Sequence, residues 1–536
     1  MGVVSFATAP IEPSYATRNM AEAIEGLQYR MDHGLPTVFH NCQFDLHFLQ
    51  RYGLRINWAC IEDTLIMARL IDNLRQSNAL KDLGESVLGI PATQKDELQT
   101  YLRKHKLGHN YIAVPDEILL PYAKQDTVLT WQLYHDFAPK VNQEIYRKEM
   151  RVRELMFNAE TRGVQLDTDL VRGRLDWASA ERQVIDSRLR SLYGDESYNP
   201  DSNPETSSWL YGRLGLNPVS FTPTGQPQVN EYNLASNPHP VTRLLVARNK
   251  RVKAQEFFQS YLDLMDEDGV LHPNINTVQA RTHRMSCTSP NLQQIPARKD
   301  RFKTREVFTA GLGWAVGADY AKQELFIAAC EAGETQLVAE LIAGVDVYRE
   351  MAAAMLSKSV ALVTNDERTA AKVTVLSMIY GAGAPKVAES FTVNTGRPFT
   401  VEQARLIRAN FKRRYPKLSR MMDELQAQVR AHGKVTNRWG RDLFVEPQRA
   451  YVATDYLVQS SGGDVMKDAL IRVADDVLPR YGAELLWPIH DELLAWFPEE
   501  PTRAALLRVE AAMRCDKFDL PLTAVAHKGK RLSELK

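Results

Sequence analysis

The segment WPIHDELLAWF, residues 487–497, places His490, Asp491 and Glu492 in a row between two apolar runs. Burying charge is costly unless the charge is paired or bound to a metal ion. The flanking runs AELLWPI and ELLAWFP have the composition of short buried strands. We therefore predict a β-hairpin whose turn carries these three polar residues, with Asp491 at the end of a sheet. A turn that is polar only because turns favour polar residues fits the same pattern.

Bulk composition excludes several classes of protein. A chain of 536 residues predicts more than one domain. Lys+Arg and Asp+Glu both total 66, so any basic surface must be local. The five scattered cysteines, without a CxxC pair, argue against a disulfide framework or a zinc site. No signal peptide or membrane-spanning apolar run is recognisable, so we expect a soluble, cytoplasmic protein.

The chain changes character along its length. Residues 1–145 alternate short strands with helical patterns, as α/β domains do. Amphipathic helices follow to about residue 195, with Gly163 and Gly194 as expected helix ends. Residues 195–240 contain seven prolines and predict a loop-rich insertion. A helix at 241–265, a strand-and-loop region, helices over 330–435 and a final mixed sheet complete an α/β and α+β multidomain chain.

A second acid also ends an apolar strand. WAVGA leads into Asp319, and a helical pattern begins just after it. If the fold brought Asp319 and Asp491 together, they would form a hard oxygen site suited to Mg²⁺. Pairs of Mg²⁺ ions favour phosphoryl transfer, because they stabilise both the attacking and the leaving oxygen. Alternatively, Asp319 only caps the helix that follows.

The segment RTAAKVTVLSMIYGAG predicts a helix with one chemical face. Four residues spaced four apart share that face, in the order Arg368, Lys372, Leu376 and Tyr380. The basic end suits a triphosphate, and the Leu–Tyr end could cover a base and a sugar. Gly381 and Gly383 then allow a hinge or a helix end. An amphipathic helix with a solvated basic end is the alternative.

Five motifs carry a family resemblance. DYAKQEL, RTAAKVTVLSMIYG and IHDE are similar to the first palm motif, the fingers helix and the second palm motif of the family A DNA polymerases, the DNA polymerase I family. RTHRMSCTSPNLQQIPAR and YLVQSSGGDVMKDAL also match family signatures. The order and spacing agree, and the match covers nearly the whole chain. The chain resembles a short phage-type member without the family's 5′-nuclease domain.

The resemblance implies a ribonuclease H-like exonuclease domain followed by a right-hand polymerase. The domains implied are a 3′–5′ exonuclease-like domain lacking its first strand (1–145), the thumb (146–275), the first part of the palm (276–345), the fingers (346–435) and the second part of the palm (436–536).

The resemblance also implies the reaction. The palm would bring Asp319 and Asp491 together to hold two Mg²⁺ ions, with the Tyr320 backbone as a further ligand. The primer 3′-oxygen would attack the α-phosphate of a deoxynucleoside triphosphate, and pyrophosphate would leave. Glu492 would support this pair of acids, and His490 would face the primer terminus.

Nucleotide and DNA contacts carry over by motif. Arg368 and Lys372 would bind the triphosphate, with Lys372 also in the catalytic set, and Leu376 and Tyr380 would border the nascent pair. Glu324 matches the steric gate that excludes a ribose 2′-hydroxyl. The residues that match minor-groove contacts to primer–template DNA are Arg284, Asn291, Gln293 and Gln459. The minor groove suits a copying enzyme because its N3 and O2 acceptors are common to all correct pairs. A structural role for Arg284 and a turn role for Asn291 and Gln293 remain open.

Two basic clusters predict tracking along phosphates. In the expected thumb they are Arg243, Arg248, Lys250, Arg251 and Lys253. In the expected fingers they are Arg405, Arg408, Lys412, Arg413, Arg414, Lys417 and Arg420. A merely solvated face is the alternative for each cluster. We expect a monomer that does not bind membranes and that works with a helicase, a primase or a processivity factor.

Residues 1–145 resemble a proofreading domain that has lost part of its site. Asn41 and Asp45 have the spacing of its second motif, and Tyr122 and Asp126 that of its third. The first motif, Asp-x-Glu on a strand before GVVSFAT, does not occur in the first 40 residues. We therefore expect a truncated first strand and little or no exonuclease activity. Each acid could also be a plain surface residue.

Other functions have to be weighed. A nuclease with degradation as its main task and a catalytically inactive DNA-binding protein are the rival classes. The presence of Asp319, Lys372, Tyr380 and Asp491 argues against the inactive protein. A single-subunit RNA polymerase is disfavoured by Glu324, because a large acid there should exclude ribonucleotides.

Four positions depart from the family pattern and lead to a prediction. Leu376 replaces a usual Phe or Tyr, Ser377 a Gly, Asp455 an Asn and His283 a Gly. Because Leu376 removes aromatic stacking near the incoming sugar, we expect slow insertion and low tolerance of dideoxynucleotides. Leu376→Phe should raise the rate in single-turnover insertion kinetics. An unchanged rate would refute this role of Leu376.

Overall fold

The computed structural model describes residues 3–7, 14–91, 93–296, 300–518 and 521–535. The chain divides into two compact units. The N-terminal unit contains Met1–Thr161 together with two later segments, Ile275–Ser286 and Trp439–Phe444. The second unit contains Arg162–Asn274, Cys287–Arg438 and Val445–Lys536. The predicted domain boundaries are not tested by this division and stay a prediction.

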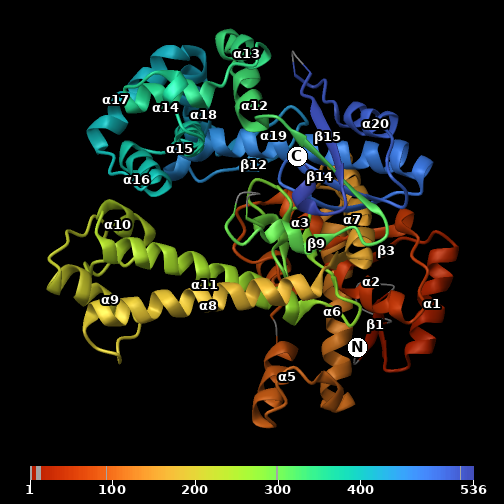
Figure 1. Ribbon diagram of the computed structural model, residues 1–536. Coiled ribbons are helices and arrows are strands. Elements are labelled where there is room, and N and C mark those ends of the chain that lie inside the picture. The colour runs from red at the N-terminus through yellow and green to blue at the C-terminus, as the bar shows by residue number, and fades with distance from the viewer. Residues whose placement is uncertain (1–2, 8–13, 92, 297–299, 519–520, 536) are drawn as a thin grey trace. The chain divides into compact units, whose positions relative to one another are not determined.

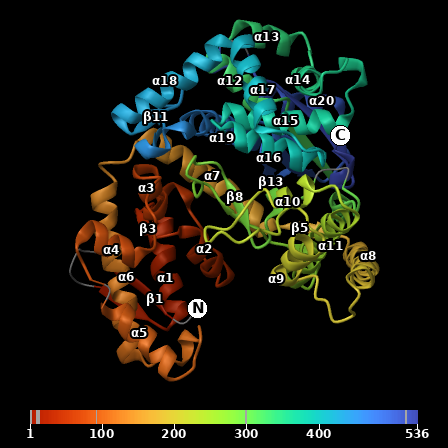
Figure 2. The same cartoon turned by 90° about the vertical axis from the view of Figure 1, so that its left-hand side faces the viewer.

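The N-terminal unit is an α/β structure, as predicted. Its strands form two pairs, antiparallel β1 (Val4–Ala7) with β2 (Ser14–Thr17) and parallel β3 (Thr37–Phe39) with β4 (Ile61–Asp63). Its helices are α1 (Met20–Asp32), α2 (Cys42–Arg51), α3 (Thr64–Ile71), α4 (Leu80–Leu88), α5 (Thr93–Lys104), α6 (Asp116–Phe137) and most of α7 (Gln143–Arg162). The long helix α6 packs against β1, β2 and α4 (Figure 2). Leu27, Leu46, Leu83 and Leu133 lie in the common core.

The second unit begins with a long helical pair. Helix α8 (Thr168–Tyr193) packs along α11 (Pro240–Leu264), as the yellow and yellow-green helices of Figure 1 show. Between them, α9 (Asn203–Ser207) and α10 (Glu231–Ser236) interrupt the proline-rich stretch. That stretch is more compact than a loop-rich insertion, because Tyr198 and Trp209 are buried with Leu189 and Leu245 in a small core.

A four-stranded antiparallel sheet forms the centre of the second unit. Its order is β13 (Glu484–Ile489), β14 (Glu492–Phe497), β10 (Trp314–Tyr320) and β15 (Ala524–Gly529).

Seven further strands of the described residues lie outside this sheet. They are β5 (Val164–Leu166), β6 (Val270–Leu271), β7 (Asn274–Asn276), β8 (Ser286–Thr288), β9 (Phe308–Thr309), β11 (Lys434–Thr436) and β12 (Asp442–Phe444). Of these, β12 and parts of β7 and β8 belong to the N-terminal unit. The central strands are apolar because they are covered by helices, α20 (Arg503–Met513) among them.

Helices fill the region between β10 and β11, as predicted. They are α12 (Gln323–Glu331), α13 (Thr335–Ile342), α14 (Val347–Leu356), α15 (Asn365–Ile379), α16 (Ala384–Thr395), α17 (Val401–Arg414) and α18 (Pro416–His432). The motif YLVQSSGGDVMKDAL lies in α19 (Ala453–Arg472), which packs against α12, α18 and α20 and is buried along most of its length. Within the described part of the chain, no helix is both long enough and apolar enough to cross a membrane.

The two predicted helix ends generate a test of backbone geometry. Gly163 and Gly194 follow α7 and α8 with φ of +69° and +83°. A Cβ on Gly163 would lie 2.6 Å from the Leu271 carbonyl oxygen, whereas one on Gly194 would meet nothing within 4 Å. Alanine at Gly194 should therefore cost about 1 kcal/mol through φ, and at Gly163 about 3 kcal/mol through φ and overlap together. Urea unfolding measures both, and equal losses would contradict the role of the contact.

Candidate active site

The two strand-terminal acids meet at one end of the central sheet. Asp319, near the end of β10, pairs with Glu492 at the start of β14. The Tyr320 amide donates a hydrogen bond to the Asp491 carbonyl at 3.2 Å. His490 and Asp491 form the turn of the β13–β14 hairpin, with His490 at φ +56°. The predicted hairpin is thus confirmed, and it places Asp491 beside Asp319.

The electrostatics of this sheet end are unfavourable to two negative charges. Burial first, and the nearby Asp319 carboxylate second, raise the pKa of Asp491 to about 6. The Lys372 ammonium acts in the opposite direction, and Glu324 adds to the rise. Lys372 and Glu324 therefore lie close enough to Asp491 to influence its charge. Three acids, Asp319, Asp491 and Glu324, thus lie near one another, and Lys372 partly offsets their charge.

Glu492 points to a different partner. Its carboxylate accepts a hydrogen bond from Arg305 at 3.1 Å, and both side chains are buried. A Cβ on Gly317 would lie 3.1 Å from the other Glu492 oxygen, so the carboxylate lies close against that glycine. Arg305 was missed by sequence reasoning, since an arginine in a short 3₁₀ turn carries no distinctive signal.

Helix α15 presents the predicted face. A capping box of Thr364 and Glu367 begins the helix. Its opposite side is buried, whereas Arg368 and Leu376 are half-buried and Lys372 is exposed. The predicted helix is confirmed, and its chemical face is the one left accessible.

Arg368 already has an anionic partner. Its Nε donates to Asp346 at 2.5 Å, and its guanidinium lies 5.7 Å from the centroid of the Tyr348 ring. Burial raises the pKa of Tyr348, and Glu324 adds to that rise, so this ring lies near both Glu324 and Arg368. Asp346 and Tyr348 were not predicted, because contact with α15 is visible only in the fold.

Tyr380 ends α15 beside an open cleft. The cleft has a volume of about 570 Å³ and is lined by Ser377, Tyr380, Gly381, Ala382, Gly383, Lys386 and Tyr451. Gly381 has φ +82°, and a Cβ there would lie 2.0 Å from the Tyr451 carbonyl oxygen. Only glycine fits at the point where the chain turns after α15.

The residues expected to contact the minor groove do not all belong to one unit. Gln293 donates to the Pro488 carbonyl at 3.4 Å and so lies beside the hairpin that carries Asp491. Asn291 accepts from the Gln293 amide, which gives it the turn role that was left open. Gln459 is half-buried on α19. Arg284 belongs to the N-terminal unit.

The basic cluster on α11 is partly neutralised, which corrects the prediction. Arg248 is buried and binds Asp186 and Asp201 at 2.5 and 2.7 Å. Arg251 binds Glu181 at 2.9 Å. The exposed cations that remain in this cluster are Arg243, Lys250 and Lys253.

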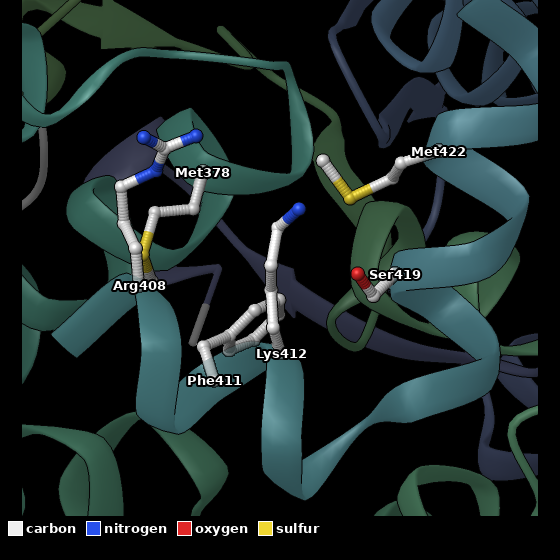
Figure 3. Close-up of a pocket in the computed structure, with 6 residues that line it drawn as sticks. All are labelled: Met378, Arg408, Phe411, Lys412, Ser419 and Met422. Carbon is white, nitrogen blue, oxygen red and sulfur yellow. The ribbon is translucent and has the colours of Figure 1, made fainter. Parts of the chain in front are cut away.

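The second cluster is also divided. Arg414 binds Glu340 and Glu350 and so stabilises the packing of α17. Figure 3 shows Arg408 and Lys412 rising from α17 beside a small cavity, with Ser419 and Met422 facing them from α18. The other exposed cations of this cluster fit both interpretations given above, a surface that contacts phosphates and a surface that is only solvated.

The second candidate site lies in the N-terminal unit. Asn41 begins α2 in the left-handed region, at φ +71°. Burial and the carboxylates of Asp63 and Asp126 raise the pKa of Asp45 to about 7. The three acids therefore lie near one another. Asp63 was missed by sequence reasoning, although an acid before a helical pattern is a recognisable cap signal.

Lys81 pairs with the third acid of that site. Its ammonium forms a buried ion pair with Asp126 and lies 4.5 Å from the centroid of the Tyr122 ring. Burial nevertheless raises the pKa of Asp126, and Lys81 only offsets part of the rise. Among the residues that the structure describes, no group of three or more Asp, Glu, His or Cys is arranged to hold a metal ion.

The polymerase-like site has a donor set that fits hard divalent cations. It offers the carboxylates of Asp319 and Asp491, which are oxygen donors of the kind that Mg²⁺ prefers. The pKa of Asp491 is raised first by burial and second by the Asp319 carboxylate, and a divalent cation bound beside the two acids would offset their repulsion.

A family model now decides the assignment. The model of DNA polymerase family A matches residues 175–534, and a 3′–5′ exonuclease model matches residues 9–142. The chain belongs to DNA polymerase family A. The predicted resemblance is confirmed, and members of this family use divalent metal ions.

The polymerase has phage and bacterial relatives. It is 29% identical to a DNA polymerase of Mycobacterium phage D29 over 493 residues, which cover 86% of this chain and 78% of the relative. It is 26% identical to DNA polymerase I of Chloroflexus aurantiacus, covering 93% of this chain and 55% of that protein. It is 25% identical to a DNA polymerase of Escherichia phage T5, covering 86% and 62%.

A solved structure shares the fold. The POL domain of Pol1 from M. smegmatis, in complex with DNA primer-template and dNTP, superimposes with a TM-score of 0.81 at 21% identity. The match covers 97% of this chain and 91% of that one. It confirms the expected exonuclease-like and right-hand polymerase architecture.

The raised pKa of Asp491 predicts a pH-dependent stability. Because the pKa rises from about 3.9 in the unfolded chain to about 6 in the fold, ionising Asp491 lowers stability as the pH rises through that window. In a chelator at about pH 8, Asp491→Asn should therefore be more stable than the wild type by about 1 kcal/mol or more, because it removes a partly buried charge beside Asp319, and should lose the advantage below about pH 4. Urea unfolding measures the difference, with the exposed Asp476→Asn as control. Equal stabilities at the higher pH would contradict the prediction.

Proposed function

We propose that the polymerase adds deoxynucleotides to the 3′ end of a primer paired with a DNA template, with Asp319 and Asp491 at the reacting centre. The pairing of β10 with β14 carries this proposal, because it brings two carboxylates to one sheet end near Lys372. Asp319, Asp491 and the Tyr320 carbonyl would hold two Mg²⁺ ions, which when bound neutralise charge that develops during phosphoryl transfer. The apolar strands on either side keep both acids in place.

Arg368 and Lys372 bind and orient the triphosphate. Both lie on the accessible face of α15, and Lys372 acts on the charge of Asp491. Arg368 has to exchange the Asp346 carboxylate for phosphate oxygens when the nucleotide arrives. The bond to Asp346 orients the guanidinium before the nucleotide binds. Because this bond has to be broken, Arg368 contributes less to the affinity for the triphosphate than a free arginine would.

Glu324 and Tyr348 select the sugar. The two side chains influence one another electrostatically and lie near the site acids. A ribose 2′-hydroxyl would meet the Glu324 carboxylate and the buried Tyr348 ring, so deoxynucleotides are favoured. Leu376 and Tyr380 border the nascent base pair from the same helix face, and Tyr380 lines the open cleft.

The proposed DNA contacts come from residues of each unit, taken separately. The residues proposed to contact the primer–template duplex are Gln293 beside the hairpin, Gln459 on α19, the exposed His490, Asn291 and Arg284. Glu492 supports the site through Arg305. The monomeric state, the cytoplasmic location and the replication partners stay predictions from the sequence.

We further propose that the exonuclease-like site has little or no activity. The ion pair of Lys81 with Asp126 supports this, because an internal cation occupies the carboxylate that the third exonuclease motif supplies.

Removing either site acid should abolish synthesis. Asp491→Ala and Asp319→Ala should each lower primer extension by more than about a hundredfold, because the loss of a group that acts on the developing charge costs that much or more. Binding of primer–template DNA should remain. Asp476→Ala, which removes an exposed acid of the same unit, serves as control. Retention of a tenth of the activity in Asp491→Ala would contradict the assignment.

The proofreading prediction has its own assay. Labelled single-stranded DNA incubated with Mg²⁺ or Mn²⁺ should keep its 3′ end, because the Lys81 ammonium pairs with the Asp126 carboxylate that would otherwise bind a metal ion. Shortening from the 3′ end that disappears in Asp126→Ala would show the prediction to be wrong. Shortening that persists in Asp126→Ala would indicate a contaminating nuclease.

A further inference from the structure

A third acid lies beside the two that are proposed to hold the metal ions. Glu492 is paired with Asp319 across β14 and β10. Residues directly opposite one another in an antiparallel pair point to the same face of the sheet, with their Cβ atoms about 5 Å apart. From its backbone position alone, Glu492 could therefore join Asp319 and Asp491 as a ligand. Two features of the second unit place its carboxylate elsewhere.

The first feature is the space at Gly317. This residue precedes Asp319 by two positions on β10 and so lies on the same face of the sheet. A Cβ on Gly317 would lie 3.1 Å from one Glu492 oxygen and 2.9 Å from Cδ1 of Leu535. The Glu492 carboxylate is therefore turned back along β10, over Gly317, into space that exists only because this residue has no side chain.

The second feature is the guanidinium of Arg305. Its Nη1 donates to the other Glu492 oxygen at 3.1 Å. The two residues are 9% and 5% exposed. A hydrogen bond between two charged groups is strengthened where water is excluded, so this contact fixes the direction of the carboxylate. Glu492 thus has an internal counter-charge and does not depend on a metal ion for one.

The turn that carries Arg305 is itself held in place. Arg305 lies in a 3₁₀ turn, Thr304–Val307. The carbonyl of the next residue, Glu306, accepts a hydrogen bond from Arg531 at 2.7 Å. The Glu306 carboxylate binds Arg174 of α8 at 2.7 Å. Because these contacts fix the backbone beside Arg305, the guanidinium is a stationary partner for the third acid.

We propose that Arg305 and the space at Gly317 keep Glu492 out of the cation-binding set, so that the site binds metal ions through two carboxylates rather than three. Arg305 is then a positioning residue. Mg²⁺ that is bound through one or two carboxylates keeps coordination positions for water and for substrate phosphate oxygens, whereas a third carboxylate would occupy one of them. This inference rests on the role of Asp319 and Asp491 in the proposed function.

The test counts the ligands of a cation bound to the protein without DNA or nucleotide. Tb³⁺ is the probe, because it is a hard cation that takes oxygen ligands, and its luminescence lifetimes in H₂O and D₂O give the number of coordinated waters. Arg305→Met frees the Glu492 carboxylate, and Gly317→Ala fills the space beside it without changing any charge. Arg438→Met is the matched control, since it breaks an arginine–glutamate pair of the same 3.1 Å length with Glu331.

The expected result is a change in the number of coordinated waters. Arg305→Met and Gly317→Ala should each bind Tb³⁺ with about one water fewer than the wild type and about tenfold more tightly, because a further carboxylate replaces water. Arg438→Met should match the wild type. Adding Glu492→Gln to Arg305→Met should restore the wild-type water count. Adding Asp319→Asn to Arg305→Met should abolish the tighter binding, which assigns it to this site.

The outcomes separate two kinds of failure. A wild-type water count in Arg305→Met or in Gly317→Ala, for a variant that circular dichroism shows to be folded, overturns the positioning proposal alone. If one of the two variants does not fold, the other decides. If Asp319→Asn in the otherwise unchanged protein keeps both Tb³⁺ binding and primer extension, the proposed function is wrong, and the positioning proposal is overturned with it.

Discussion

The structure of the polymerase part depends on holding two carboxylates together against their mutual repulsion. Asp319 and Asp491 lie at the same end of two paired strands, and their proximity together with burial raises the pKa of Asp491. The rigidity needed for this arrangement comes from the apolar strands β10, β13 and β14, whose side chains are almost all buried. An alternating half-exposed sheet would allow these ends to shift apart.

The surrounding charges are arranged around that pair. Glu492 accepts a hydrogen bond from Arg305, so its charge is balanced by that arginine. Lys372 is the positive group that lowers the pKa of Asp491. Arg368 donates to the Asp346 carboxylate and so already has an anionic partner. The equal totals of acidic and basic residues thus conceal a local arrangement of charge: Asp319, Asp491 and Glu324 lie near one another at the sheet end, and the exposed Lys372 on α15 lies near them.

The N-terminal unit includes two segments from the polymerase part of the sequence, in addition to the residues of its own candidate site. Asn73 donates to two segments that come from the polymerase part of the sequence, and His283, which lies on one of them, contacts the Arg69 carbonyl of the N-terminal stretch. The departure of His283 from the family's usual glycine therefore has a physical account, because the ring bonds to Arg69 and Arg441 compensate for a left-handed backbone.

Local patterns were enough to predict the β13–β14 hairpin, the helix α15 and the ends of α7 and α8, because each depends on apolar periodicity or on glycine within a few residues. The motifs also led to the family. Contacts between distant segments could not be read in this way. The neutralisation of Arg248 by Asp186 and Asp201, and the pairings of Arg305 with Glu492 and Lys81 with Asp126, join residues without any sequence spacing rule. The sequence by itself determined which chemical groups the chain carries and on which elements, since these follow from local periodicity. Only the tertiary structure decided which charges are neutralised and which stay accessible, because an ion pair depends on distance in space and on burial.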